Sequence, residues 1–317
     1  MVIINKQIDL ILIKFPILFP IIYFLALHFF PNYEDIIILT TIFLLAEPHF
    51  GATWPFFFNK SNKDYIKDQR VKLLYFPVLI VVFCLLGYFY FKATFLLIFF
   101  AANIFHVTRQ SYGVLKLYIE NKSASDVYEI VMYSFNALFF LVGFLRFYIP
   151  LIDNDIVILL TILTALTMFL TFAIILYLFK SISDIMILFT GCIIFFPICF
   201  VDRPIHAILM GVTMHYTQYI ALTFKVTKFR DLELDKLKKI SFAKKINLKF
   251  LFFILLYSVI LTAISFSGKS SDIIIKNIII IGITLQMLHF YIDSQLWKFS
   301  NHHNRKNVLN YLVQKII

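Results

Sequence analysis

The chain has 317 residues, of which 61% are hydrophobic and only 15% are charged. Soluble domains carry a larger share of charged residues, so this composition excludes soluble enzymes and binding modules and indicates a polytopic membrane protein. The formal net charge is +11. Because the basic residues cluster in alternate segments between apolar runs, they indicate membrane topology and exclude a nucleic-acid-binding surface.

Apolar runs long enough to cross a bilayer predict an all-α transmembrane bundle of about ten helices. The expected spans are 8–30, 36–58, 73–91, 94–117, 127–149, 155–179, 185–201, 205–224, 248–267 and 273–298. The first run is too long for a cleaved signal peptide and is expected to remain as a helix. Prolines inside the runs, such as Pro48 and Pro197, are expected to kink these helices.

The distribution of Lys and Arg predicts the orientation of the chain. They are concentrated in every second segment, which places both termini on the cytoplasmic side. We expect residues 1–317 to form a single integral membrane domain, in contact with membrane lipid, in a bacterial inner membrane. The longest hydrophilic stretch, 225–249, is basic and is expected to be cytoplasmic, either as a short helix at the lipid head groups or as a solvated loop.

Four of the expected spans contain histidines and other polar residues. The histidines are His49, His106, His215 and His289. An ionisable residue at the bilayer centre costs roughly 2.5–3.5 kcal/mol on insertion scales, so such residues face a protein interior. A lone intramembrane histidine is usually a packing residue held by hydrogen bonds. Four at similar depth on parallel helices favour a shared site in one cavity.

This set of residue types predicts a metal centre. Neutral imidazoles with one or two carboxylates bind non-haem iron, zinc, manganese or copper, and we expect all four histidines to be ligands of Fe(II) or another first-row metal. Amides near them on the same helices are placed to orient the imidazoles. These amides are Asn103, Gln110 and Gln218.

Three charged residues are the expected catalytic groups: Glu47, Arg109 and Asp293. Asp293 stands four residues after His289, on the same helical face, and is either a ligand or a group that orients the imidazole. Arg109 either neutralises a carboxylate such as Glu47 or reaches the head groups.

The remaining histidines and the cysteines are expected to lie outside the site. His28 and His206 are expected at the membrane interface and His302 and His303 as exposed residues. Three cysteines without a CxxC spacing argue against disulfides and thiolate metal sites. Motifs for nucleotide, serine or zincin hydrolysis do not occur.

The stretch Glu47-Pro48-His49-Phe50-Gly51 resembles the early Pro-His-Gly motif of the Brp/Blh family of membrane β-carotene 15,15′-dioxygenases. The family is similar in size and hydropathy, is thought to hold iron through intramembrane histidines, and cleaves β-carotene with O2 into retinal. The resemblance implies that His49 is an iron ligand. A later family helix carries two histidines four apart, whereas here Tyr219 follows His215 at that distance, so that His106 or His289 would have to supply the missing ligand.

The leading hypothesis is an iron-dependent oxygenase of the membrane that acts with O2 on a long apolar substrate, such as a carotenoid. Exclusion of water would protect reactive intermediates. A proton-coupled transporter is an alternative, because intramembrane His, Asp and Glu also form proton relays. A structural membrane protein, in which the polar clusters only hold helices together, is a third.

Overall fold

A computed structural model describes residues 2–149, 154–238 and 248–313. The described chain is helical and contains no strand, which confirms the all-α class. Residues 225–238 of the predicted basic segment continue a helix, and 239–247 lie outside the described residues.

The fold consists of helices of very different lengths. The α-helices are α1 (Lys6–Ile8), α2 (Leu18–Phe29), α3 (Glu34–Thr41), α4 (Glu47–Phe57), α5 (Lys63–Asp68), α6 (Phe76–Tyr90), α7 (Lys92–Tyr118), α8 (Ser125–Tyr148), α9 (Asn154–Phe179), α10 (Ile182–Ile193), α11 (Pro204–Lys238), α12 (Leu248–Ser267), α13 (Ile273–Asn277), α14 (Ile279–Leu296), α15 (His302–Asn304) and α16 (Asn310–Val313). Wider π-helical turns occur at η1 (Asp9–Lys14), η3 (Ile42–Ala46), η5 (Val71–Tyr75) and η9 (Arg305–Leu309), and 3-10 turns at η2 (Pro31–Tyr33), η4 (Lys60–Asn62), η6 (Lys122–Ala124) and η7 (Phe196–Cys199).

Six helical segments of the described chain are long and apolar enough to cross a membrane. They are Pro31–Phe57, Val71–Tyr90, Lys122–Tyr148, Asp155–Phe179, Phe250–Ser267 and Ile273–Leu296. A seventh is added if Lys6–Lys14 and Leu18–Phe29, which are bent by 57°, form one span. These helices indicate an integral membrane protein.

The predicted count of ten spans is not confirmed. All ten predicted runs contain helix, but α7 and α11 carry the polar residues around His106 and His215 and are not among the six. The run expected at 185–201 is a helix of only 12 residues, α10, that is followed by a 3-10 turn with Pro197 in its first turn. Proline has no amide hydrogen to donate, so the α-helix does not continue through this turn.

The helices gather into two compact units. Unit 1 comprises Met1–Ile38 and Asn103–Gln218, and unit 2 comprises Leu39–Ala102 and Tyr219–Ile317. Along the chain, α3, α7 and α11 each contribute residues to both units.

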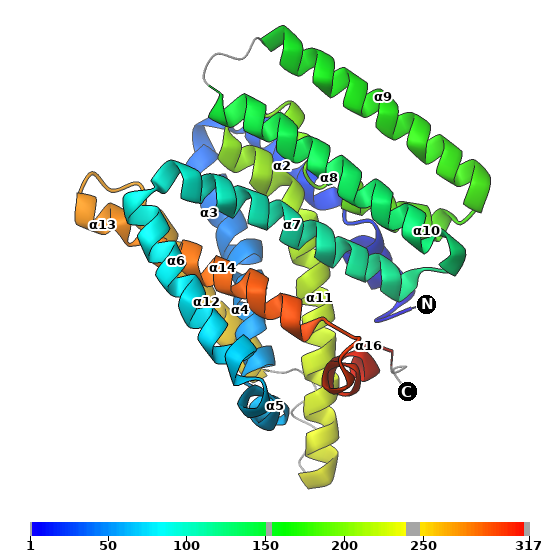
Figure 1. Cartoon of the computed structure of the whole chain (residues 1–317), viewed down its shortest axis with the longest axis vertical. Coiled ribbons are helices and arrows are strands. Elements are labelled where there is room, and N and C mark those ends of the chain that lie inside the picture. Colours follow the sequence, from blue (N-terminus) through cyan, green and yellow to red (C-terminus); the bar gives the residue numbers. More distant parts are fainter. Residues whose placement is uncertain (1, 150–153, 239–247, 314–317) are drawn as a thin grey trace. The chain divides into compact units, whose positions relative to one another are not determined.

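In unit 1, α8 packs against both α9 and α10 (Figure 1). The amide of Asn136 on α8 donates to the carbonyl oxygen of Gly191 on α10, at 3.0 Å. The first part of α11 comes so close to the end of α10 that a Cβ atom at Gly211 would collide with the carbonyl oxygen of Ile194. The outer face of α9 is exposed and apolar, with Ile158 and Phe169 among its side chains, as expected for a helix in contact with lipid.

In unit 2, α4, α6, α12 and α14 pack together, with α4 against α12 and α6 against α14 (Figure 1). Gly51 permits the first of these contacts, because a Cβ atom there would lie 2.9 Å from the ring of Tyr257 on α12. A cluster of buried residues also joins α4 to α11 and α12, through Ala52, Tyr219 and Phe250.

Candidate metal centre

His49 lies in the first turn of α4, where its position depends on the preceding proline. Pro48 occupies one of the first two positions of the helix, and the wide turn η3 precedes it. A proline is well tolerated there because the first amide groups of a helix have no partner within the helix. The His49 side chain is buried, and its ring centroid lies 4.6 Å from that of His289.

His289 and Asp293 are placed one helical turn apart on α14, and both are almost completely buried. Their side chains face each other, with 3.7 Å between His289 Nε2 and Asp293 Oδ2. Phe50 covers the His289 ring edge-on, with ring centroids 5.1 Å apart. Unit 2 therefore gathers two imidazoles and one carboxylate in an apolar interior.

Two hydroxyl groups hold this cluster in place. Tyr219 donates to Asp293 Oδ1 at 2.7 Å, and Thr53 donates to the same oxygen at 3.0 Å. The Thr53 oxygen also lies 2.7 Å from His289 Nδ1. The four side chains come from α4, α11 and α14, so the network fixes three helices of unit 2 to one another.

The network bears on the tautomer of His289. Thr53 has a single hydroxyl hydrogen, and Tyr219, His289 and Asp293 all lie within hydrogen-bond distance of its oxygen. In the arrangement where Thr53 donates to Asp293, its oxygen accepts a hydrogen from Nδ1 of His289. A neutral imidazole with its hydrogen on Nδ1 has its lone pair on Nε2. Nε2 and Asp293 Oδ2 are then both electron-rich and lie 3.7 Å apart. Two metal–ligand bonds of about 2.0–2.2 Å would reach across this distance, so the donors fit a single cation.

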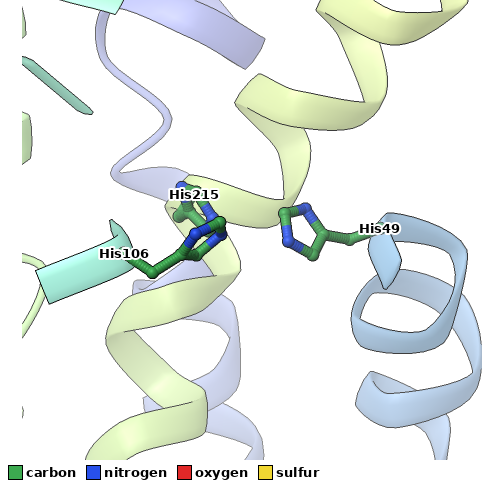
Figure 2. A group of neighbouring side chains, drawn as sticks. All are labelled: His49, His106 and His215. Atoms are coloured by element: carbon green, nitrogen blue, oxygen red, sulfur yellow. The ribbon is translucent and has the colours of Figure 1, made fainter. Parts of the chain in front are cut away.

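Unit 1 contains a second pair of buried imidazoles. His106 on α7 and His215 on α11 have ring centroids 5.7 Å apart and nearly perpendicular planes. Figure 2 shows the two rings together, and its third labelled histidine, His49, belongs to unit 2. The sequence predicts that all four histidines share one cavity. Because the four belong to different units, this stays a prediction.

The amides expected to orient the imidazoles have mixed surroundings. Gln218 is buried, and its side-chain amide donates a hydrogen bond of 2.7 Å to the carbonyl oxygen of Ile13. This bond connects Gln218 to the N-terminal turn η1. Asn103 is buried on α7, one turn before His106, whereas Gln110 is partly exposed.

The other two expected catalytic residues differ in exposure. Glu47 is buried in unit 2, where Ser265 on α12 contacts it at 3.5 Å. It precedes His49 by two positions, and residues two apart on a helix point in different directions. Arg109 is exposed on α7, as expected for a side chain that reaches head groups or solvent.

Two other histidines have hydrogen-bond partners at both ring nitrogens. His206 contacts the hydroxyl of Tyr23 and the carboxylate of Glu34, each at 2.7 Å. His303 contacts Asn62 at 2.8 Å and Asn307 at 3.2 Å. An imidazole whose nitrogens are both occupied offers no lone pair to a metal ion, so these two residues fit structural roles. His206 is buried, and its position at the membrane interface stays a prediction.

Sequence reasoning did not include Thr53 in the site and noted Tyr219 only as a departure from a histidine. The available signal was helical spacing, since Thr53 follows His49, and Tyr219 follows His215, by four residues. Small hydroxyl residues are common in membrane helices, so this signal alone would not have singled them out.

The class of protein that these features define is an all-helical membrane protein that buries two imidazole pairs, one of them beside a carboxylate. No family model matches the sequence, and no curated protein and no solved structure matches it. The resemblance to the carotenoid dioxygenases therefore depends on the residues around His49.

Proposed function

We propose that the chain is a membrane-embedded, metal-dependent oxygenase that uses Fe(II) and O2 to oxidise a long apolar substrate. The observation that carries this proposal is the buried pair of His289 and Asp293 in unit 2, whose facing atoms lie 3.7 Å apart, together with the His49 ring beside His289. Two histidines and one carboxylate are the ligand set of many non-haem Fe(II) oxygenases. When bound, the iron would supply the activation of O2.

The protein's own residues would have three tasks in this reaction. Thr53 would keep the hydrogen of His289 on Nδ1 and so direct Nε2 to the metal. Tyr219 would hold the Asp293 carboxylate through its hydroxyl group. Phe50 and the surrounding apolar side chains would exclude water, which protects reactive intermediates from side reactions.

The substrate is proposed to be a carotenoid that is cleaved to retinal. This part of the proposal depends on the likeness of the Pro48-His49-Phe50-Gly51 segment to the dioxygenase motif. It also fits the setting, because substrates of this class dissolve in the bilayer that the apolar spans are able to cross. A ten-span topology in a bacterial inner membrane, with both termini inside, belongs to the same proposal. His106 and His215 are further ligand candidates.

A proton-coupled carrier is the second candidate function, and the hydrogen-bonded network favours it. Tyr219, Thr53, Asp293 and His289 form a continuous chain of contacts of 2.7–3.0 Å in the interior of unit 2. Intramembrane chains of this kind move protons in pumps and transporters.

Metal analysis of protein purified in mild detergent separates the two functions. The oxygenase should contain about one iron per chain, and His49→Ala should lose it. His302→Ala is the matched control because His302 is exposed, and it should keep the iron. Wild-type protein without any transition metal, even after incubation with Fe(II) in the absence of air, would contradict the oxygenase and favour the carrier.

The substrate is tested in a carotenoid-producing host. Expression should bleach the pigment and yield an aldehyde, in a way that requires iron and O2 and is abolished by His49→Ala. Unchanged pigment in the presence of iron-loaded protein would exclude a carotenoid as the substrate and leave other lipids as candidates.

A further inference from the structure

Unit 2 contains a large pocket lined mainly by aromatic side chains. Its volume is about 600 Å³, and it is formed by the end of α4, the last third of α11, the first half of α12 and Leu285 of α14. The lining includes Trp54, Phe58, Phe253 and Tyr257, together with the polar Asn59 and the basic Arg230. The residues that line it include no acidic side chain.

Arg230 gives the pocket a cationic wall. Its side chain is only 5% exposed, and its guanidinium carbon lies 5.4 Å from the centre of the Phe56 ring. The guanidinium group thus lies over an aromatic ring, and its N–H donors form a planar fork. This fork matches the oxygen atoms of a phosphate or carboxylate.

The ends of the apolar spans place the pocket near one membrane surface. The span Pro31–Phe57 ends and the span Phe250–Ser267 begins within the pocket lining. Tryptophan and tyrosine, here Trp54 and Tyr257, are enriched at this level because one end of each ring system is polar. The pocket therefore has an apolar part that faces the hydrocarbon region and a cationic part at the level of the head groups.

The chain that follows α4 is basic. Residues 60–72 contain five basic residues and two acidic ones, Asp64 and Asp68, so their net charge is +3; the basic residues are Lys60, Lys63, Lys67, Arg70 and Lys72. Basic segments beside a membrane span attract anionic lipids, each Lys or Arg contributing about 1 kcal/mol near the surface. The charge around the pocket thus favours an anionic occupant that comes from the bilayer itself.

We infer that this pocket binds one anionic phospholipid, with its phosphate at Arg230 and an acyl chain against the rings of Trp54, Phe253 and Tyr257. The inference does not depend on the proposed oxygenase function. Such a lipid would fill the space between α4, α11 and α12 and hold these helices of unit 2 together.

Native mass spectrometry of the full chain in mild detergent tests this site. The probes are phosphatidylglycerol and phosphatidylcholine with identical acyl chains. Wild-type protein should retain one phosphatidylglycerol in preference to phosphatidylcholine. Arg230→Gln should weaken this retention about 10- to 100-fold, as expected for the loss of a charge-assisted hydrogen bond. Arg305→Gln, the same change at an exposed residue outside residues 60–72, should retain phosphatidylglycerol as wild type does.

Arg230→Lys keeps the charge but loses the planar fork, and it should bind phosphatidylglycerol with intermediate strength. Equal retention of the two lipids by wild-type protein would overturn the inference, and this measurement requires no variant to fold. Unchanged retention in a folded Arg230→Gln would overturn it as well. Neither result would alter the iron content expected for the oxygenase.

Discussion

Thr53 on α4 and His289 on α14 are joined by a hydrogen bond of 2.7 Å between the threonine hydroxyl oxygen and the imidazole Nδ1. Both side chains are completely buried. The bond crosses 236 positions of the sequence and gives Nδ1 of His289 a partner, which leaves Nε2 on the side of Asp293. Partners of this kind keep a metal-binding imidazole in one tautomer and orientation.

Replacing Thr53 with Val should therefore weaken metal binding without removing a ligand. Valine has nearly the shape of threonine but no hydroxyl group, so both His289 and Asp293 lose a partner. We expect metal affinity to fall about 10- to 100-fold, the usual cost of losing such a partner. Titration of metal-free protein with Fe(II) measures the change. Thr53→Ser restores the hydroxyl and should restore most of the affinity, and a Val variant that binds as wild type does would contradict this role.

Substitutions of His289 and Asp293 test whether both are ligands, as proposed. His289→Ala should give metal-poor, inactive protein, because a donor atom is lost. Asp293→Asn keeps the size of the side chain but removes the negatively charged donor, and it should lose metal as completely. Metal content and activity are measured for both variants after identical purification. If Asp293→Asn retains weakened but measurable binding, the carboxylate only orients the imidazole. Full metal in both variants would show that the pair is structural.

Gly211 and Gly113 provide a matched pair of stability predictions in unit 1. A methyl group at Gly211 would collide with the backbone of Ile194, whereas a methyl group at Gly113 has nothing within 4 Å. Gly211→Ala should destabilise the protein by about 1–3 kcal/mol through overpacking. Gly113→Ala should leave stability unchanged or raise it by about 0.5–1 kcal/mol, since alanine favours helix. Thermal unfolding followed by circular dichroism compares them, and equal effects would show that α11 and Ile194 are not in close contact.

His303, beyond the last apolar span, should make stability depend on pH. Burial, followed by the nearby His302 and Lys306, lowers the pKa of His303 below its ordinary value of 6.5. The neutral ring donates from Nε2 to Asn62 and accepts at Nδ1 from Asn307, and it stacks on Tyr65 with ring centroids 4.2 Å apart. Protonation of Nδ1 would remove the second of these bonds.

Because the pKa is lower in the folded chain, the unfolded chain binds more protons, and stability increases with pH. The contribution of His303 is fully present above pH 6.5 and is lost as the pH falls through the folded pKa. The unfolding temperature of wild-type protein should therefore decrease between about pH 7 and pH 5. His303→Gln should remove this dependence, while His302→Gln, at an exposed neighbour, should keep most of it, because burial is the largest cause of the lowered pKa of His303. An identical pH profile for wild type and His303→Gln would exclude this effect.

The amino-acid sequence alone determined the class of the protein and the positions of its helices. Long apolar runs can bury their backbone polar groups in lipid only as helices, and each predicted run contains helix in the structure. The sequence also placed His289 beside Asp293, because residues four apart on a helix share one face. The sequence did not determine the number of spans. A polar residue such as His106 or His215 lowers the hydropathy of its helix, and hydropathy does not show whether that polar residue faces a protein interior or water.

Only the tertiary structure showed which side chains complete the cluster. Thr53 and Tyr219 contact each other across 166 positions, and Arg230 of the basic segment is buried against Phe56. Helical periodicity gives the face on which a residue lies, but it does not say which helix packs against that face. That choice follows from close packing, as where Gly51 lets α4 approach Tyr257 of α12, and close packing depends on the shapes of side chains that are distant in the sequence.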